Sequence, residues 1–236
     1  MGEPGQFVIP PAEKSIFTLD SFLVRDRILP EEYSELIQVE KKHREWSGKT
    51  SFSYRWQDLL ELETKPEPGS NLELIQRFFK EHIKNQALVD LGGGPRRVTY
   101  MYNLAKLLKA KAYIDVDVQI DSSEQALFQP IEEKTTGDFY EADVNADMLD
   151  FVAHMKDGAA NFAVNGIDST FVYNREYTKA LANELVRATH KGGIIFGVDS
   201  VVGLDLQAIS KTNESPIKFI GQVVEDMDDG FVFEKI

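Results

Sequence analysis

The sequence predicts an α/β fold: a doubly wound, mostly parallel sheet with a C-terminal antiparallel hairpin and an N-terminal helical extension. Beyond Asn85, short apolar runs alternate with amphipathic helical patterns, and this alternation is typical of parallel strands joined by helical crossovers. The apolar run Ala87–Leu91 leads directly into Gly92, Gly93 and Gly94, as a buried strand leads into a tight turn. Near the C-terminus two apolar runs flank the turn signal DDG, which is typical of an antiparallel hairpin.

A proline-rich linker divides the chain. Residues 64–70 (TKPEPGS) contain two prolines and a glycine, so we expect an N-terminal helical extension or lid over residues 1–69 and a Rossmann-like domain over residues 70–236. Before the linker, Pro30 and the acids that follow it are typical of a helix start. After the linker, Ser70 and Glu73 have the form of a capping box, which predicts a second helix.

The remaining elements follow from the same patterns. Asn174 has the residue type of a helix N-cap, and a helix over 122–134 is expected to be disturbed at Pro130. Residues 228–230 are expected to form the turn of the C-terminal hairpin. The expected strands are 87–91, 112–116, 138–142, 161–166, 194–198, 217–224 and 231–233, and the expected helices beyond Asn85 are 98–109, 122–134, 148–155 and 174–190.

The composition limits the classes of function. The chain has 236 residues, no Cys and a formal net charge of −13, so disulfides, zinc–thiolate sites and thiol nucleophiles are excluded. Phosphate contacts need clustered Lys and Arg, so we expect a small-molecule substrate and no general nucleic-acid binding, although a local basic patch is compatible with this charge. No apolar run reaches the roughly 18 residues that span a bilayer, so we expect no membrane association and a cytoplasmic location. The histidines lack metal-ligand spacing, and no metal is expected.

The segment from Ala87 to Asp115 has the pattern of a ligand site. Glycines after a buried strand let the backbone turn sharply and approach a ligand, and the following helix start offers free N–H groups. Asp115 ends the next apolar run about twenty residues further on. An acid at this position can accept hydrogen bonds from both hydroxyls of a ribose. The plain alternative is that the glycines form only a turn, and that Asp117 or neither acid is functional. The pattern favours a nucleoside-containing cofactor.

The order of these motifs resembles that of the class I S-adenosylmethionine-dependent methyltransferases. The matching stretches are VDLGGG at 89–94, AYIDVD at 112–117, EAD at 141–143 and KGGIIFGVD at 191–199. In that family a glycine loop follows the first strand, acids end the second and third, a GG turn precedes the fifth, and an antiparallel hairpin closes the sheet. The resemblance covers the chain from about Leu72 to the C-terminus, and it implies S-adenosyl-L-methionine as the cofactor.

The resemblance also implies roles for individual residues. Asp90 would orient the amino group of the cofactor. Asp115 would accept hydrogen bonds from the ribose hydroxyls, and Asp143 would accept a hydrogen bond from the adenine amino group. The Val144 N–H would face a ring nitrogen. The cofactor-binding residues implied in this way are Asp90, Gly92, Gly93, Gly94, Asp115, Asp143 and Val144.

Three residues keep alternative interpretations. Asn165, at the end of the fourth strand of the resemblance, would lie beside the transferable methyl group as the catalytic candidate, or it would only satisfy loop backbone. Asp143 could instead cap the helix that follows. Arg96 stands where many family members have a further glycine, so the loop is stiffer or Arg96 meets the cofactor carboxylate.

The expected activity is therefore transfer of a methyl group from S-adenosylmethionine to an N or O nucleophile of a small molecule. Two alternatives remain open: a non-catalytic methyltransferase-like binding protein, and an NAD(P)-dependent oxidoreductase, for which the usual G-x-G-x-x-G would need glycine at Arg97. The N-terminal helices are expected to cover the substrate side of the site or, alternatively, to bury themselves against the sheet or a second subunit. The side chains proposed for that cover are Tyr33, His43, Trp46, Tyr54 and Trp56.

Overall fold

The computed structural model of the chain describes residues 17–47, 60, 65–92, 100–118, 128, 130–165, 174–198, 200–225 and 228–236. Side chains are described over the same ranges except at 43–47, 100, 200, 223–225 and 228–229. Several residues named above therefore lie outside the described part of the chain or have no described side chain: His43, Trp46, Tyr54, Trp56, Gly93, Gly94, Arg96 and Arg97.

The fold is α/β, built on an eight-stranded mixed sheet with the strand order β3-β4-β2-β1-β5-β6-β8-β7. The five strands β4, β2, β1, β5 and β6 are parallel, whereas β3, β8 and β7 each run antiparallel to a neighbour. The strands are β1 (Ala87–Leu91), β2 (Ala112–Asp117), β3 (Pro130–Thr136), β4 (Phe139–Asn145), β5 (Asn161–Val164), β6 (Ile194–Gly197), β7 (Ile217–Glu225) and β8 (Asp228–Lys235).

The direction in which strands are added reverses beside β1. The chain passes from β1 to β2 and β4 on one side, and then returns to β5 and β6 on the other side. In open α/β sheets such a reversal leaves a crevice outside the carboxyl ends of the two central strands, and ligands bind there. The glycine at the end of β1 lies at this position.

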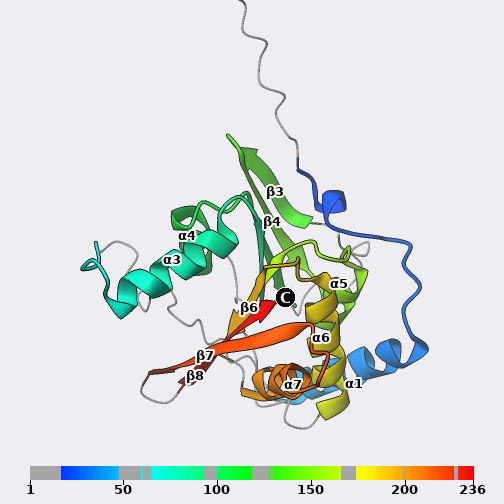
Figure 1. The fold of residues 1–236 in the computed structure, drawn as a ribbon. Coiled ribbons are helices and arrows are strands. Elements are labelled where there is room, and N and C mark those ends of the chain that lie inside the picture. The colour runs from blue at the N-terminus through cyan, green and yellow to red at the C-terminus, as the bar shows by residue number, and fades with distance from the viewer. Residues whose placement is uncertain are drawn as a thin grey trace, which may run out of the picture.

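Helices cover both faces of the sheet (Figure 1). On one face lie α3 (Asn71–Ile83) and α4 (Tyr100–Leu107), and on the other lie η1 (Leu19–Ser21), α1 (Glu31–Ser47), α5 (Met148–His154), α6 (Arg175–Ala188) and α7 (Ser200–Ser210). Each face has its own core cluster, and Leu88 and Val89 show the alternation, since they belong to opposite clusters. Strands buried on both faces read as continuous apolar runs, which is why β1 was recognisable in the sequence.

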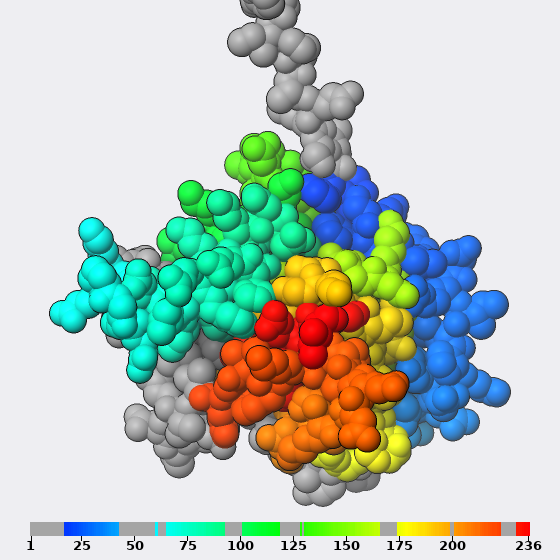
Figure 2. Space-filling view, viewed as in Figure 1, coloured from blue at the N-terminus to red at the C-terminus, as the bar shows by residue number. Residues whose placement is uncertain are grey.

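The N-terminal extension packs into the larger core cluster. Leu19, Phe22 and Leu23 are buried with residues of α5 and α6. Helix α1 packs against α6. The Tyr33 hydroxyl donates a hydrogen bond to Glu184 in the last part of α6. Figure 2 shows this extension, in blue, on the opposite side of the molecule from α3 and α4. The described part of the extension therefore contributes to the core on the face away from α3 and α4.

Two helix starts confirm their predicted caps. The Ser70 side chain accepts from Glu73 N at 3.2 Å, and the Asn174 side chain accepts from Tyr177 N at 3.4 Å. A side-chain oxygen at this position pairs with one of the N–H groups that the first helical turn leaves without a partner. Short polar residues thus mark the start of α3 and α6.

Two local expectations are wrong. Residues 130–136 form strand β3, antiparallel to β4, and not the end of a helix over 122–134. Pro130 supplies no N–H for a helix but is tolerated as the first residue of a strand at the sheet edge. Residues 228–230, expected as a turn, are part of β8 and pair with Val223, Val224 and Glu225 of β7.

Candidate functional site

Three of the predicted acids lie in one row across the sheet. Asp90 of β1 is the register partner of Asp115 of β2, and Asp115 is the register partner of Asp143 of β4. Neighbouring strands are about 4.8 Å apart, so the three residues occupy adjacent positions near the carboxyl ends of their strands. The sequence separates them by more than twenty residues each, and the parallel register brings them together.

Asp90 is fully buried, and both of its carboxylate oxygens accept a hydrogen bond. The Tyr113 hydroxyl donates to Oδ2 at 2.9 Å, and the Asn165 amide donates to Oδ1 at 2.8 Å. Burial raises the pKa of Asp90 to about 6, while the bonds from Asn165 and Tyr113 act in the opposite direction. The carboxylate is thus held in one orientation by two neutral donors.

Asp115 differs from Asp90 although it is also buried, with 5% exposure. Its Oδ1 atom is enclosed and has no hydrogen-bond partner among the described residues. Burial, followed by the charges of Asp90, Asp117 and Asp143, raises the pKa of Asp115 well above its ordinary value. Because a buried polar atom without a partner is costly, this oxygen is suited to accept a hydrogen bond from a ligand.

A pocket of about 230 Å³ opens beside Asp115. Its lining comes from α4 and strands β2, β3 and β4, and it consists of Tyr102, Tyr113, Asp115, Glu132, Lys134, Glu141, Ala142 and Asp143. Lys134 forms an ion pair with Glu141, so the cation of this lining is already matched by an acid. The remaining acids make the wall negative, and it therefore favours ligand groups that donate hydrogen bonds over phosphates.

Asp117, the alternative to Asp115, is placed differently. Its Oδ1 accepts from the N–H of Val118 at 2.7 Å, so one carboxylate oxygen is used within the chain. Asp117 is also half-buried, whereas Asp115 is buried and lines the pocket. The geometry therefore favours Asp115 as the acceptor for a bound ligand.

Asp143 lines the pocket from within β4, and it does not cap the next helix. The cap of α5 is Asp147, whose side chain accepts from Leu149 N at 2.9 Å and Asp150 N at 3.3 Å. The cap alternative for Asp143 is thus wrong. Val144 follows it with its side chain in the larger core cluster, and it is the register partner of Val116 on β2 and of Pro130 on β3.

Gly92 adopts a conformation that side chains disfavour. Its φ is +76°, it is buried, and its N–H donates to Val116 O at 2.9 Å. Positive φ is readily reached only without a Cβ atom. Gly92 is therefore required for the sharp turn at the end of β1, and the expectations for Gly93, Gly94 and Arg96 lie outside the described residues.

Asn165 joins the ends of β5 and β1. Its backbone N–H donates to Leu91 O at 3.0 Å, and its side-chain amide donates to Asp90. The residue is 3% exposed. This geometry shows an orienting contact to Asp90, and contact with a reacting methyl group stays a prediction.

Sequence reasoning missed Tyr113 and the contribution of β3. Tyr113 lies two residues before Asp115 on one strand, so side-chain alternation places both on the same face, and this signal could have identified it. Glu132 and Lys134 were assigned to a helix and therefore could not be placed at the pocket. Tyr102 also lines the pocket, from α4.

Comparison with known proteins gives no relative by sequence. No family model matches the chain, and no curated protein matches it. Solved structures of similar fold include an rRNA methylase from Streptococcus thermophilus (12% identity, 72% of this chain and 99% of that chain, TM-score 0.46). TrmN from Thermus thermophilus is 13% identical over 69% of this chain and 48% of that chain, with a TM-score of 0.46. The antibiotic-resistance methyltransferase Kmr is 13% identical over 69% of this chain and 92% of that chain, with a TM-score of 0.42.

These comparisons show likeness to methyltransferases in fold alone. Two expectations made from composition are contradicted by them, namely a small-molecule substrate and the absence of general nucleic-acid binding, because proteins of this fold include one named as an rRNA methylase. The physical reason is that a net charge of −13 sums the whole chain, and part of it lies in the acids of the pocket. Net charge therefore does not determine the class of substrate.

Among the described residues, no group of three or more His, Cys, Asp or Glu side chains has an arrangement that could hold a metal ion. Among the helices that the structure describes, none combines the length and apolar character needed to cross a membrane.

Proposed function

We propose that the chain binds S-adenosyl-L-methionine and transfers its methyl group to an acceptor. The observation that supports this proposal is the setting of Asp115. Its buried Oδ1 lacks a partner among the described residues, the residue lines a pocket, and it is the register partner of Asp90 and Asp143. A nucleoside offers hydroxyl and amino donors to such acceptors. The positive-φ turn at Gly92 lies at the end of the adjacent strand.

The described residues fit the donors of this cofactor. Asp115 would accept from the ribose hydroxyls, Asp143 from the amino group of the base, and Asp90 would attract the ammonium group of the amino-acid part. The backbone at Gly92 would lie against that part, where a Cβ atom would obstruct it. The negative wall suits a ligand that carries positive charge on both sulfur and nitrogen.

Catalysis in this proposal depends on position. The bound cofactor supplies an electrophilic methyl group on a sulfonium. The chain holds the cofactor and aligns the acceptor, which accounts for most of the rate gain in a displacement of this kind. Asn165 and Tyr113 contribute by fixing Asp90.

A binding protein without transferase activity is the second candidate. One observation favours it: the amide of Asn165, the catalytic candidate, is directed at Asp90. In that case the cofactor would bind and no methyl group would be transferred. The two candidates differ in one measurable outcome, which is transfer.

The test combines binding and transfer. Calorimetry with S-adenosylmethionine, S-adenosylhomocysteine and NAD⁺ should show binding of the first two and none of the third. Cofactor with a labelled methyl group is then incubated with fractionated cell extract, and label is counted in the RNA, DNA, protein and low-molecular-weight fractions. Label in a fraction, absent with Asp115→Ala, supports the transferase. Binding without label supports the second candidate, and no binding contradicts both.

A further inference from the structure

The site contains two neighbouring buried carboxylates in unequal surroundings. Asp90 and Asp115 are register partners on β1 and β2. Asp90 accepts from Tyr113 and Asn165, one donor on each oxygen. Asp115 has an enclosed Oδ1 atom that receives no hydrogen bond from the described residues.

The difference in the hydrogen bonds that Asp90 and Asp115 accept decides which of the two carboxyl groups is more easily ionised. Two like charges at adjacent buried positions repel each other strongly, so ionising both at once is unfavourable. Hydrogen bonds from neutral donors stabilise the ionised form of the group that accepts them. Asp90 has two such bonds, so the anion is placed on Asp90.

We propose that, in the free protein, Asp115 carries the proton of this pair while Asp90 is the anion, and that a ligand donating hydroxyl groups to Asp115 releases that proton. The O–H bond of the Asp115 carboxyl group breaks, the proton passes to solvent, and the resulting carboxylate accepts the ligand's hydrogen bonds. This inference rests on the proposed function, because the ligand is the ribose of that cofactor. Its consequence is that cofactor binding depends on pH.

The positive charges around Asp90 and Asp115 do not offset the negative charge that an ionised Asp115 would carry. Lys134 on β3 is paired with Glu141, and Lys106 on α4 lies over the ring of Tyr102, 4.3 Å from the ring centroid. The described charged groups that surround the pair are Asp90, Lys106, Asp117, Glu132, Lys134, Glu141 and Asp143. This set contains more acids than bases, so it favours the neutral form of Asp115.

Tyr113 acts here as a positioning residue. Tyr113 lines the pocket, and its hydroxyl donates from β2 across to Asp90 on β1. Removing only the hydroxyl would weaken the preference for an anion at Asp90 and move the proton toward that residue. The pH profile of proton release therefore reports its role, which a change in packing alone would not alter.

The experiment measures protons released when S-adenosylhomocysteine binds. At several values between about pH 5 and pH 8, calorimetric titrations are performed in two buffers that both buffer at that pH and whose ionisation enthalpies differ, such as phosphate and Tris near neutral pH. The slope of the observed enthalpy against ionisation enthalpy gives the number of protons. We expect release of up to about one proton per ligand in the wild-type chain. Asp115→Asn should bind more weakly and release fewer protons.

Two hydroxyl deletions complete the test. Tyr113→Phe should shift the pH profile of proton release, whereas Tyr33→Phe, which removes a 3.0 Å bond to Glu184 on the other side of the sheet, should not. Wild-type binding without proton release would overturn this inference and leave the proposed function intact. Identical pH profiles of proton release for Tyr113→Phe and the wild type would also overturn this inference, even if Asp115→Asn binds the ligand too weakly to measure. No binding by the wild type would instead contradict the proposed function.

Discussion

Asn165 and Asp90 connect the ends of the two central strands, with the Asn165 amide nitrogen 2.8 Å from Asp90 Oδ1. Both residues are buried, so the contact is shielded from water. It links β5 to β1 at the point where the order of strands reverses. The orientation of the Asp90 carboxylate therefore depends on a residue that follows another strand.

Removing this amide should weaken cofactor binding. Asn165→Ala leaves Asp90 with one donor, and a hydrogen bond to a charged group contributes roughly 1.5–3 kcal/mol. We expect affinity for S-adenosylhomocysteine to fall by about tenfold or more, measured by calorimetry. Asn174→Ala, which removes another buried amide, is the control and should lower stability alone. Equal affinities for Asn165→Ala and wild type would show that Asp90 needs no such support.

Replacing Asp115 should stabilise the unliganded protein at neutral pH. A folded-state pKa above the ordinary value means that the folded chain binds more protons, so the stability contributed by Asp115 falls as pH rises above that ordinary value. Asp115→Asn removes this penalty. Its melting temperature should exceed that of the wild type at about pH 7.5, and the difference should narrow toward about pH 4. A lower melting temperature than wild type at neutral pH would contradict the prediction.

Gly92 and Gly69 allow a matched comparison of two positive-φ glycines. Gly92 has φ +76° at the site, and Gly69 has φ +79° in a turn with open space around its Cβ direction. Alanine at either position should cost about 1–2 kcal/mol of stability from backbone strain. Only Gly92→Ala should also lose cofactor affinity, as calorimetry on folded protein would show. If both variants bind like the wild type, the glycine at β1 serves the turn alone.

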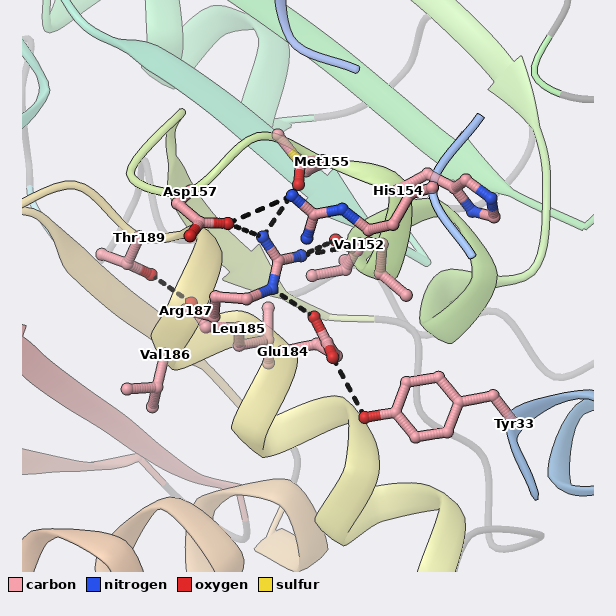
Figure 3. A network of polar contacts seen from close by, with 12 residues as sticks. Tyr33, Val152, His154, Met155, Asp157, Glu184, Leu185, Val186, Arg187 and Thr189 are labelled. Atoms are coloured by element: carbon pink, nitrogen blue, oxygen red, sulfur yellow. Dashed lines mark hydrogen bonds and ion pairs between the residues drawn. The ribbon is translucent and has the colours of Figure 1, made fainter. Parts of the chain in front are cut away.

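Arg187 should matter for stability and not for the site. It donates to the backbone oxygens of Val152, Ala153 and Met155 and pairs with Asp157 and Glu184 (Figure 3). Arg187→Ala removes all of these donors, so we expect a loss of about 2–4 kcal/mol in denaturant unfolding.

The control for Arg187→Ala is Arg27→Ala. The Arg27 side chain pairs with Asp157 at 3.2 Å at the surface, and loss of this ion pair should cost less than about 1 kcal/mol. Cofactor affinity should be retained by both variants wherever they are folded. A large loss of affinity for Arg187→Ala would indicate that this network is coupled to the pocket.

The sequence allowed the central strands and the row of acids to be predicted, because local pattern and parallel topology determine both. Asp90 and Asp115 each stand near the carboxyl end of an apolar run, and parallel strands bring such ends to one edge. The helix starts at Ser70 and Asn174 were predictable because a cap is a local interaction.

Contacts made between distant segments could not be predicted in the same way. The pattern at 130–136 is polar and ambiguous, and pairing with β4 makes it a strand. The bond from Tyr113 to Asp90 depends on strand register and on side-chain rotamer, which a single sequence does not specify. The class of acceptor was wrongly inferred, because net charge does not describe a local surface.

The central claim is that the Asp115 carboxylate accepts hydrogen bonds from the ribose hydroxyls of the cofactor. Its most direct test is the affinity of S-adenosylhomocysteine for the wild type, Asp115→Ala and Asp117→Ala, measured by calorimetry on variants shown to be folded. Asp117 is the matched control, because it is two residues away on β2 and already accepts from Val118 N. We predict that Asp115→Ala weakens binding by about tenfold or more, from the loss of hydrogen bonds to a charged group, and that Asp117→Ala changes it much less. Unchanged affinity for Asp115→Ala, or a larger loss for Asp117→Ala, would contradict the account.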